Sequence, residues 1–509
     1  MSGQPVLIAV DLGTTSCRAF AFAPDGRVLG QAGRSYPLRT PGSGRVEQDP
    51  AELLAAADAA VPAALAQAGA GPGDVLGLVL STYLHGLGAL DARGAPLTPV
   101  LTWADGRAAP QADAMRARPD WAGLAARTGC PPHPMYPLYK LRWLREERPD
   151  LWSRAAGFAD PKSLLIRHWT GEWALDHSVA SATGLVDVSR LDWDPGALAW
   201  AGVDPSRLPA LVPPTTALPL LREAAARLGL RAGTPVVVGA GDGMLANLGS
   251  GAIEPGVLAA TVGTSAALRA VLPVPRTDPR ARLWCYHLAP GRYVLGGSLS
   301  SGGMVLAWVR DRLYAPDTPY ETLLAEAAAV PPGAGGLLFL PYLSGERSPG
   351  FNARMRGVWF GLGLEHGRGH LVRSALEGIA FRLASVLEPL EELAGPAREV
   401  RAAGGLARSP LWLSVCADVL GREVAVPDQV ESTALGAFVL GGVALGLFPG
   451  LEAVHRFVGV RERVAPDPDR HAHYRELFDL YRRVDTKVRE EFDVLARLRA
   501  RHPPGGGGG

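Results

Sequence analysis

The chain has 509 residues, 47% of them hydrophobic and 20% charged, and its 51 basic residues nearly balance its 50 acidic ones. This composition is typical of a folded globular protein and excludes wholesale disorder and collagen-like repeats. A net charge of +1 gives no broad attraction to nucleic acid or to an anionic membrane, so neither is expected as a partner. At about 150 residues per domain, the length predicts two large domains or three smaller ones.

The cysteines and the start of the chain bear on its compartment. Cys17, Cys130, Cys285 and Cys416 are far apart and form no C-x-x-C pair, which favours free thiols in a reducing cytosol over disulfides or a zinc site. No basic segment precedes the first apolar run, so no signal peptide is predicted and a cytoplasmic location is expected. Residues 432–451 carry no charge, but their glycines and a proline favour a buried helix over a membrane span.

Alternating apolar runs and turn residues predict the elements of the chain in order. Three strands open the sequence, separated by a Gly/Thr/Ser loop and by an Asp-Gly hairpin signal: 6–10, 18–22 and 28–36. Further strands are predicted over 75–80, 234–239, 257–262, 266–271, 336–340 and 400–403. Helices are predicted over 51–68, 138–148, 409–417 and 472–499.

The opening strand-loop-strand pattern recurs in the second half. Gly13-Thr14-Thr15-Ser16 and Gly263-Thr264-Ser265 each follow a buried-strand run, and their first glycines lie 250 residues apart. The recurrence predicts two similar domains, unless the triplet is repeated by chance. The predicted organisation is 1–248 and 249–450 as the two domains, 451–502 as a helical extension and 503–509 as a disordered glycine tail.

The first loop has the residues of a phosphate site. Backbone N–H groups in such a turn can bind phosphate oxygens, and three hydroxyl side chains can add hydrogen bonds. Asp11 precedes the loop and would repel phosphate unless Mg²⁺ lay between them, which predicts a magnesium nucleotide. The alternative is a tight turn with an Asp cap.

A second carboxylate, Asp242, lies between two glycines after the buried run 234–239. Such a residue can approach a ligand closely and accept a proton from a hydroxyl that attacks a γ-phosphate. The alternative is an Asp that caps the helix after it.

Five motifs in a fixed order carry a resemblance to a known family. They are Asp11-Leu12-Gly13-Thr14-Thr15-Ser16, Met135-x-Pro137-x-x-Lys140-Leu141-x-Trp143-Leu144-x-Glu146-Glu147, Gly263-Thr264-Ser265, Gly357-x-Trp359-x-Gly361-Leu362 with His370-Leu371-x-x-Ser374-Ala375-Leu376-Glu377, and Ala403-Gly404-Gly405-Leu406-Ala407-Arg408-Ser409. In this order they resemble the FGGY carbohydrate kinases of the actin-like ATPase superfamily.

The resemblance implies an α/β fold with two RNase H-like domains and a catalytic cleft between them, and it implies ATP and Mg²⁺ as cofactors. Asp242 would be the catalytic base, and Asp11 and Asp242 would lie near the metal. Some members of the family are dimers, so a homodimer is a further expectation. The nucleotide would be held by Gly13, Thr14, Thr15, Ser16, Gly263, Thr264, Ser265, Gly303, Gly404, Gly405 and Ser409.

The resemblance also bears on the substrate. His85, Gly86, Trp103 and Asp105 fall where the family binds sugar. The alternatives are that Trp103 is a core-facing tryptophan and that Asp105 is a surface partner of Arg107. Two runs, 128–135 and 176–185, resemble those of the family's gluconate kinases, whereas Tyr83-Leu84 before His85 departs from them. A substrate carboxylate would need a cationic or donor partner, for which the candidates are His133, Lys140 and Arg107.

The sequence therefore predicts an ATP-dependent kinase that phosphorylates the C6 hydroxyl of D-gluconate. One alternative is a kinase for xylulose or another pentulose or polyol. Another is a non-catalytic actin-fold protein that binds sugar or nucleotide without turnover.

Overall fold

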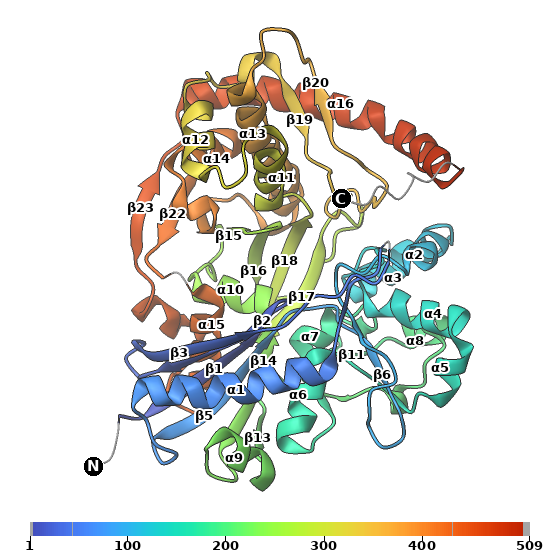
Figure 1. The fold of residues 1–509 in the computed structure, drawn as a ribbon, viewed down its shortest axis with the longest axis vertical. Helices are drawn as coiled ribbons and strands as arrows, with labels where there is room; N and C mark the ends of the chain where they lie inside the picture. Colours follow the sequence, from blue (N-terminus) through green and yellow to red (C-terminus); the bar gives the residue numbers. More distant parts are fainter. Residues whose placement is uncertain (1–3, 43, 430, 502–509) are drawn as a thin grey trace. The chain divides into compact units, whose positions relative to one another are not determined.

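The computed structural model describes residues 4–42, 44–429 and 431–501, and the chain divides into two compact units (Figure 1). The first comprises Met1–Pro255, Ala270–Leu295 and Gln429–Gly459, and the second comprises Gly256–Arg269, Gly296–Asp428 and Val460–Gly509. The units are discontinuous in sequence, whereas the predicted domains 1–248 and 249–450 are continuous. The predicted disordered tail, 503–509, lies outside the described residues.

The first unit is built on a six-stranded sheet in the order β13-β14-β5-β1-β2-β3. The antiparallel hairpins join β1, β2 and β3, whereas β1, β5 and β14 are parallel neighbours. The central strands are buried on both faces, which is why they read as continuous apolar runs. The strands are β1 (Val6–Leu12), β2 (Ser16–Phe22), β3 (Val28–Ser35), β5 (Val75–Thr82), β13 (Ala217–Pro219) and β14 (Pro235–Gly241).

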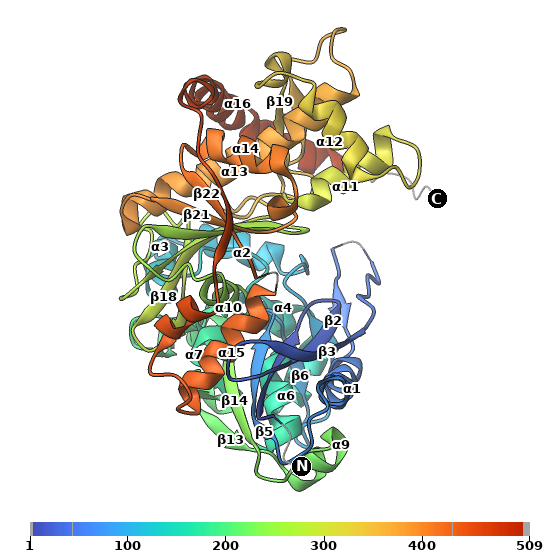
Figure 2. The same ribbon diagram turned by 90° about the vertical axis from the view of Figure 1, so that its left-hand side faces the viewer.

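Helices cover both faces of this sheet (Figures 1 and 2). Ile8 and Val10 share a core with α1 (Pro50–Ala68) and α6 (Pro161–Thr170). Leu7 and Val79 instead approach Gly441 of α15 (Ser432–Ala444), because successive side chains of a strand point to opposite faces. Helix α10 (Asp242–Gly249) packs on α15. The buried-helix prediction for 432–451 is confirmed over α15, and no described helix is long and apolar enough to cross a membrane.

Small elements between β5 and β13 also belong to the first unit. They are β6 (Gly88–Leu90), β7 (Val100–Leu101), α2 (Ala109–Arg116), α3 (Trp121–Thr128), α4 (Pro137–Glu147), α5 (Pro149–Arg154), β8 (Gly157–Ala159), β9 (Ala174–Asp176), α7 (His177–Ser181), β10 (Val186–Asp187), β11 (Asp192–Trp193), α8 (Pro195–Ala201) and β12 (Ala210–Val212), with β4 (Glu47–Gln48) before α1 and α9 (Arg222–Leu228) after β13.

The second large sheet repeats the strand order of the first. Its order is β17-β18-β16-β15-β21-β22-β23, so β18-β16-β15-β21-β22 corresponds to β3-β2-β1-β5-β14. The strands β15, β21 and β22 are parallel, like β1, β5 and β14. The recurrence predicted from the two Gly/Thr/Ser loops is thereby confirmed. The bounds are β15 (Val257–Val262), β16 (Ala266–Leu272), β17 (Trp284–Ala289), β18 (Arg292–Leu299), β21 (Glu399–Gly404), β22 (Glu423–Pro427) and β23 (Val460–Val464).

Helices of the second unit gather around α13 (Arg368–Ala394), which contacts α11 (Gly303–Leu313), α12 (Tyr320–Ala328) and α14 (Pro410–Leu420). The long helix predicted near the C-terminus is α16 (Pro468–Arg501). The segment 451–502, expected to be helical, also contains the strand β23. Its Val-Arg-Glu-Arg-Val sequence is mostly exposed and antiparallel to β22, so pairing at the sheet edge, rather than burial, makes it a strand.

Candidate functional site

The loop between β1 and β2 has the geometry of an anion site. Its four carbonyl oxygens all accept hydrogen bonds within the unit: Gly13 from the Tyr36 hydroxyl, Thr14 from the Gln48 amide, Thr15 from the Tyr36 N–H at 3.0 Å, and Ser16 from the Gly13 N–H at 2.9 Å. In a trans peptide the C=O and the next N–H point in opposite directions. The N–H groups of Thr14 and Thr15 therefore face away from those partners, as a phosphate-binding loop requires.

Asp11 lies at the end of β1, 7% exposed, with both carboxylate oxygens engaged. One accepts from the Ser81 hydroxyl at 2.8 Å and the other from the Arg18 guanidinium at 3.1 Å. Arg18 also pairs with Glu431 at 2.7 Å. The carboxylate is thus held rigidly at the edge of the sheet, and Ser81 and Arg18 are partners that the sequence analysis missed.

Asp11 and Asp242 belong to the same edge of the first sheet. Leu12, Thr82 and Gly241 are in register across β1, β5 and β14, and each aspartate adjoins this row. Within the described residues, no three acidic, His or Cys side chains are grouped as a metal site. The pair fits a magnesium ion of the kind that takes one or two carboxylates and draws its other ligands from phosphates and water.

The second Gly/Thr/Ser loop lies against two other glycine segments of its unit. Gly263 closes its turn on Ser265 with a 2.9 Å hydrogen bond, and its carbonyl accepts from the Gly303 N–H at 2.6 Å, at the start of α11. A Cβ on Gly404 would lie 2.5 Å from the carbonyl oxygen of Val262. The loop, a helix N-terminus and the Gly404-Gly405 turn therefore converge, a combination suited to phosphate groups.

Ser409 is 5% exposed and caps a helix of the same unit. Its hydroxyl accepts the Trp412 N–H at 3.2 Å and caps α14. The helix predicted from Ser409-Pro410 is confirmed, whereas the direct nucleotide contact expected for Ser409 stays a prediction.

Asp242 is the first residue of α10, directly after β14. Its Oδ1 accepts the Gly243 N–H at 2.6 Å, and its side chain is partly buried. A Cβ on Gly241 would lie 2.5 Å from Leu84, so the glycine before it allows the chain to pass close to the segment after β5. The N-cap of α10 is Gly241 and no side chain caps this helix, so the alternative in which Asp242 is the cap is wrong. A carboxylate in the first turn of a helix can face a ligand.

His85 lies three residues beyond β5 and is held in a left-handed conformation with φ of 68°. Its Nδ1 donates to the Ala182 carbonyl at 2.7 Å, so in the neutral ring Nε2 is the acceptor. The edges of Tyr136 and Tyr286 pack against the ring. A non-glycine residue at positive φ stores strain of the kind found at ligand sites. The neighbouring Gly86 packs on Pro161, where a Cβ would approach to 2.5 Å.

Trp103 connects the expected sugar segment to the first phosphate loop. Its indole Nε1 donates to the Thr14 hydroxyl at 3.0 Å, and the side chain is half-buried. It is therefore neither a fully buried core residue nor a free surface one.

Asp105 is 1% exposed, and its acceptor positions are engaged within the unit. Oδ2 accepts the Val46 N–H at 2.9 Å, and Arg107 donates to both oxygens, with Nε at 2.8 Å and Nη2 at 2.7 Å. Asp105 was expected to accept hydrogen bonds from sugar hydroxyls. In the structure its buried carboxylate instead connects the Val46 backbone to Arg107. The sequence analysis weighed this pair as a surface one, but it is buried.

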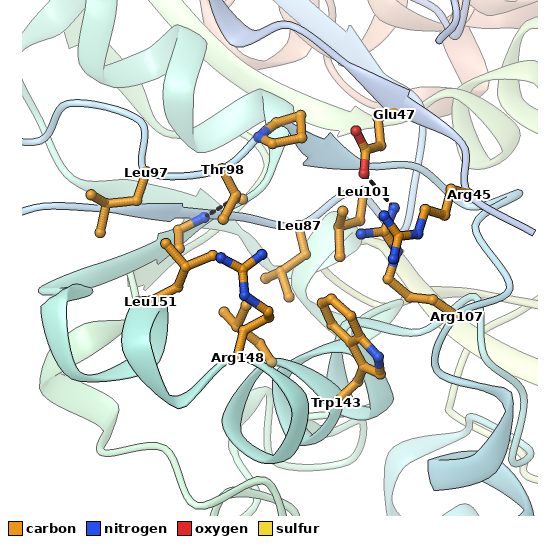
Figure 3. A pocket seen from close by; sticks show the side chains of 14 residues that line it. Arg45, Glu47, Leu87, Leu97, Thr98, Leu101, Arg107, Trp143, Arg148 and Leu151 are labelled. Atoms are coloured by element: carbon orange, nitrogen blue, oxygen red, sulfur yellow. Dashed lines mark hydrogen bonds and ion pairs between the residues drawn. The ribbon is translucent and has the colours of Figure 1, made fainter. Parts of the chain in front are cut away.

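Arg107 also donates to Glu47, across a pocket lined by Arg45, Trp143 and Leu151 among others (Figure 3). Two carboxylates therefore neutralise one guanidinium, and the Trp143 ring lies 5.0 Å from it. A substrate carboxylate would have to compete with both, which disfavours Arg107 among the three candidates.

Lys140 is completely buried, and its ammonium donates to the backbone carbonyls of His85, Thr102 and Leu101 at 2.6, 2.7 and 3.2 Å. All three donors of an ammonium group are then used. Burial lowers the pKa of Lys140 to about 7. The direct substrate contact expected for Lys140 is therefore corrected: it ties the His85 segment to the Thr102 segment.

His133 is half-buried in the loop before α4. Its Nδ1 accepts the Met135 N–H at 3.2 Å, so in the neutral ring Nε2 carries the hydrogen. Of the three candidates for a substrate carboxylate, His133 is only half-buried, whereas Lys140 is completely buried and Arg107 is paired with two carboxylates.

The run 176–185 organises the other site segments. Asp176 caps α7, Ser178 Oγ accepts the Gly241 N–H at 3.1 Å, and the Ala182 carbonyl holds His85. The sequence analysis used this run as a sign of substrate class and missed its contacts, as well as those of Lys162. Buried polar residues in an otherwise apolar stretch were the available signal.

Two repeated α/β units, each with a Gly/Thr/Ser loop after its first strand, are typical of proteins that bind phosphate groups. The models of the N-terminal and C-terminal domains of the FGGY family of carbohydrate kinases match residues 6–249 and 258–445. The chain therefore belongs to the FGGY family of carbohydrate kinases, and ATP is implied as its phosphoryl donor.

Individual relatives match along nearly the whole chain. It is 36% identical over 502 residues to the gluconokinase of Bacillus subtilis (strain 168), covering 96% of this chain and 97% of that one. The crystal structure of gluconate kinase from Lactobacillus acidophilus is similar with a TM-score of 0.91 at 30% identity, covering 95% and 98% of the two chains. That of ligand-bound xylulose kinase from Lactobacillus acidophilus has a TM-score of 0.92 at 30% identity, covering 96% and 100%.

Proposed function

We propose that this protein is a gluconate kinase that transfers the γ-phosphoryl group of ATP to the C6 hydroxyl of D-gluconate. The observation that carries the proposal is the 36% identity to a gluconokinase over 96% of the chain. The runs 128–135 and 176–185 support the same substrate because they resemble those of the family's gluconate kinases. The first run contains His133, and the second holds His85 through the Ala182 carbonyl.

In the proposed reaction Asp242 acts as the general base. Its carboxylate accepts the proton of the C6 hydroxyl while that oxygen attacks the γ-phosphorus in line and the bond to ADP breaks, with no covalent enzyme intermediate. Asp11 and Asp242 would hold a magnesium ion together with the phosphates, and such an ion offsets the phosphates' negative charge when bound.

The two histidines have complementary roles in this proposal. His85 Nε2 accepts a hydrogen from a substrate hydroxyl, and His133 Nε2–H donates to the carboxylate. Trp103 supplies an apolar wall, while Lys140 and Asp105 position these segments from behind. The loops at Gly13 and at Gly263, with Gly303, Gly404 and Gly405, bind the phosphates through backbone N–H groups.

The second candidate is a xylulose kinase, favoured by the TM-score of 0.92 to a xylulose kinase structure. A neutral ketose would leave His133 without a carboxylate partner. A third possibility, binding of sugar and nucleotide without turnover, requires that Asp242 never accept a proton.

The deciding experiment measures ADP release from Mg-ATP with D-gluconate, D-xylulose, L-ribulose, glycerol and no sugar. We expect a gluconate-dependent rate well above the others. A ketose-dependent rate would replace the substrate but keep the kinase mechanism, and no sugar-dependent release would favour the non-catalytic protein.

A further inference from the structure

The peptide unit between Ala240 and Gly241, one residue before Asp242, is held from both sides. The Ala240 carbonyl accepts from the Lys162 ammonium at 2.7 Å, and the Gly241 N–H donates to the Ser178 hydroxyl at 3.1 Å. Carbonyl and N–H belong to one planar peptide unit and point in opposite directions. The two bonds therefore fix the rotation of that plane, and with it the direction in which the chain enters Asp242.

The strand alone does not provide this support. The pairing of β14 with β5 shifts register between Val237 and Ala240 and resumes only at Ala240 and Gly241, and Gly239 has a φ of +70°. The N–H groups of Val238 and Gly239 turn to the carbonyls of Thr216 and Pro214 instead of to β5. A bulge of this kind redirects the end of a strand, so the side-chain bonds to the Ala240 carbonyl and the Gly241 N–H add support where the regular ladder is interrupted.

Lys162 is itself anchored by a buried partner. Its ammonium lies 3.1 Å from the Asp176 carboxylate, and both side chains are completely buried. Burial lowers the pKa of Lys162, and the nearby carboxylates of Asp176, Asp160 and Asp242 oppose that shift. A buried ion pair adds little net stability because its desolvation cost is large. The Lys162–Asp176 pair is therefore better explained by the positions in which it holds its neighbours than by a contribution to stability.

The Lys162–Asp176 pair also connects α6 and α7, the two helices whose side chains hold the Ala240–Gly241 peptide. Lys162 is in the first turn of α6, whereas Asp176 is the N-cap of α7 and accepts the Val179 N–H at 2.9 Å. Ser178 is on α7, which packs against β14 (Figure 1). One ion pair thus sets the spacing of both groups that grip the Ala240–Gly241 peptide.

We infer that Lys162 and Ser178 are positioning residues for Asp242, and that they hold its carboxylate in line with the attacking hydroxyl of the sugar. This inference rests on the proposed function, in which Asp242 is the base. Both side chains are completely buried and bond the backbone before Asp242, so losing them should lower the rate of transfer while leaving the binding of sugar and ATP nearly intact.

The test compares Lys162→Met and Ser178→Ala with wild type and with Asp194→Asn as a matched control. Asp194 is also a buried helix N-cap paired with a cation, Arg127, at 2.6 Å, but that pair does not hold the Ala240–Gly241 peptide. For each protein, kcat and both KM values are measured, together with amide hydrogen exchange over residues 238–244.

Because a misplacement of about 1 Å can cost roughly 100-fold in rate, we expect kcat to fall by about that factor in Lys162→Met and by about tenfold in Ser178→Ala. Both KM values should stay within about threefold, exchange over 238–244 should rise, and the control should match wild type. If Lys162→Met does not fold, Ser178→Ala decides, since it removes one hydroxyl.

Unchanged kcat and unchanged exchange in the folded variants would overturn the inference, as would a loss expressed in KM alone. A wild-type protein that phosphorylates no sugar would instead overturn the proposed function. The hydrogen exchange over residues 238–244 would then still report whether Lys162 and Ser178 hold this segment.

Discussion

Replacing Lys140 with methionine separates two roles that this lysine could have. The side chain becomes one atom shorter and loses its charge and its three bonds to the carbonyls of His85, Thr102 and Leu101. If Lys140 positions these segments, the variant should lose on the order of tenfold in kcat/KM for gluconate and for any neutral substrate alike, as losses of supporting contacts do. If it bound the carboxylate, the loss would fall on gluconate alone.

The same substitution has a signature in stability. Burial lowers the pKa of Lys140 from its ordinary value of 10.5 to about 7. Between these values the unfolded chain holds a proton that the folded chain has released, so the free energy of unfolding rises with pH. From pH 7 to pH 9 this contribution amounts to about 2 kcal/mol, at 1.4 kcal/mol for each tenfold change in proton concentration and with half the folded molecules still protonated at pH 7.

The assay is urea unfolding of wild type and Lys140→Met at pH 7 and pH 9. We expect the difference in stability between the two proteins to change by about 2 kcal/mol in favour of the wild type over that range. Lys162 is present in both proteins, so its own titration cancels. A constant difference would refute the lowered pKa of Lys140, whereas a selective loss of gluconate activity would refute its positioning role.

Three further substitutions test other parts of the structure. Asp242→Asn should lower transfer by at least about 10²-fold while calorimetry still detects sugar binding, and near wild-type transfer would remove Asp242 from the role of base. Gly404→Ala should raise the KM for ATP and lower stability by about 1–3 kcal/mol, because φ is +76° and the new Cβ would lie 2.5 Å from the Val262 carbonyl oxygen. Gly395→Ala, with φ of +87° but open space around its Cβ, is the control, and equal effects on the KM for ATP would contradict the argument. Burial, and then the neighbouring His177, lowers the pKa of His287 to about 3. Below about pH 6.5 the unfolded chain binds a proton at His287 that the folded chain does not, so the free energy of unfolding decreases as the pH falls. Between pH 6.5 and 4.5, His287→Leu should therefore lose about 2 kcal/mol less stability than the wild type. Identical acid unfolding curves would exclude His287 as a source of that sensitivity.

Much of the fold could be predicted from local pattern. The apolar runs 6–10, 75–80 and 257–262 are strands buried on both faces, and such strands show the signal without interruption. The helix α1 begins at its Asp49 cap and ends at Gly69, which adopts the left-handed conformation that glycine allows. The two Gly/Thr/Ser loops predicted the repeated units, because a turn between two strands is specified by residues adjacent in sequence.

What only the tertiary structure decided was the partners of the charged residues and the membership of the units. Residues 429–459 follow most of the second unit and yet belong to the first, because α15 covers the open face of its sheet. Lys140 meets carbonyls 38 and 55 residues away, and Lys162 meets one 78 residues away. The sequence alone determined that this is a repeated α/β protein with a Gly/Thr/Ser loop after the first strand of each repeat, since those features depend on neighbouring residues. It could not determine which polar groups meet a substrate and which brace the site, because a buried charge is satisfied by whichever backbone groups the topology brings beside it.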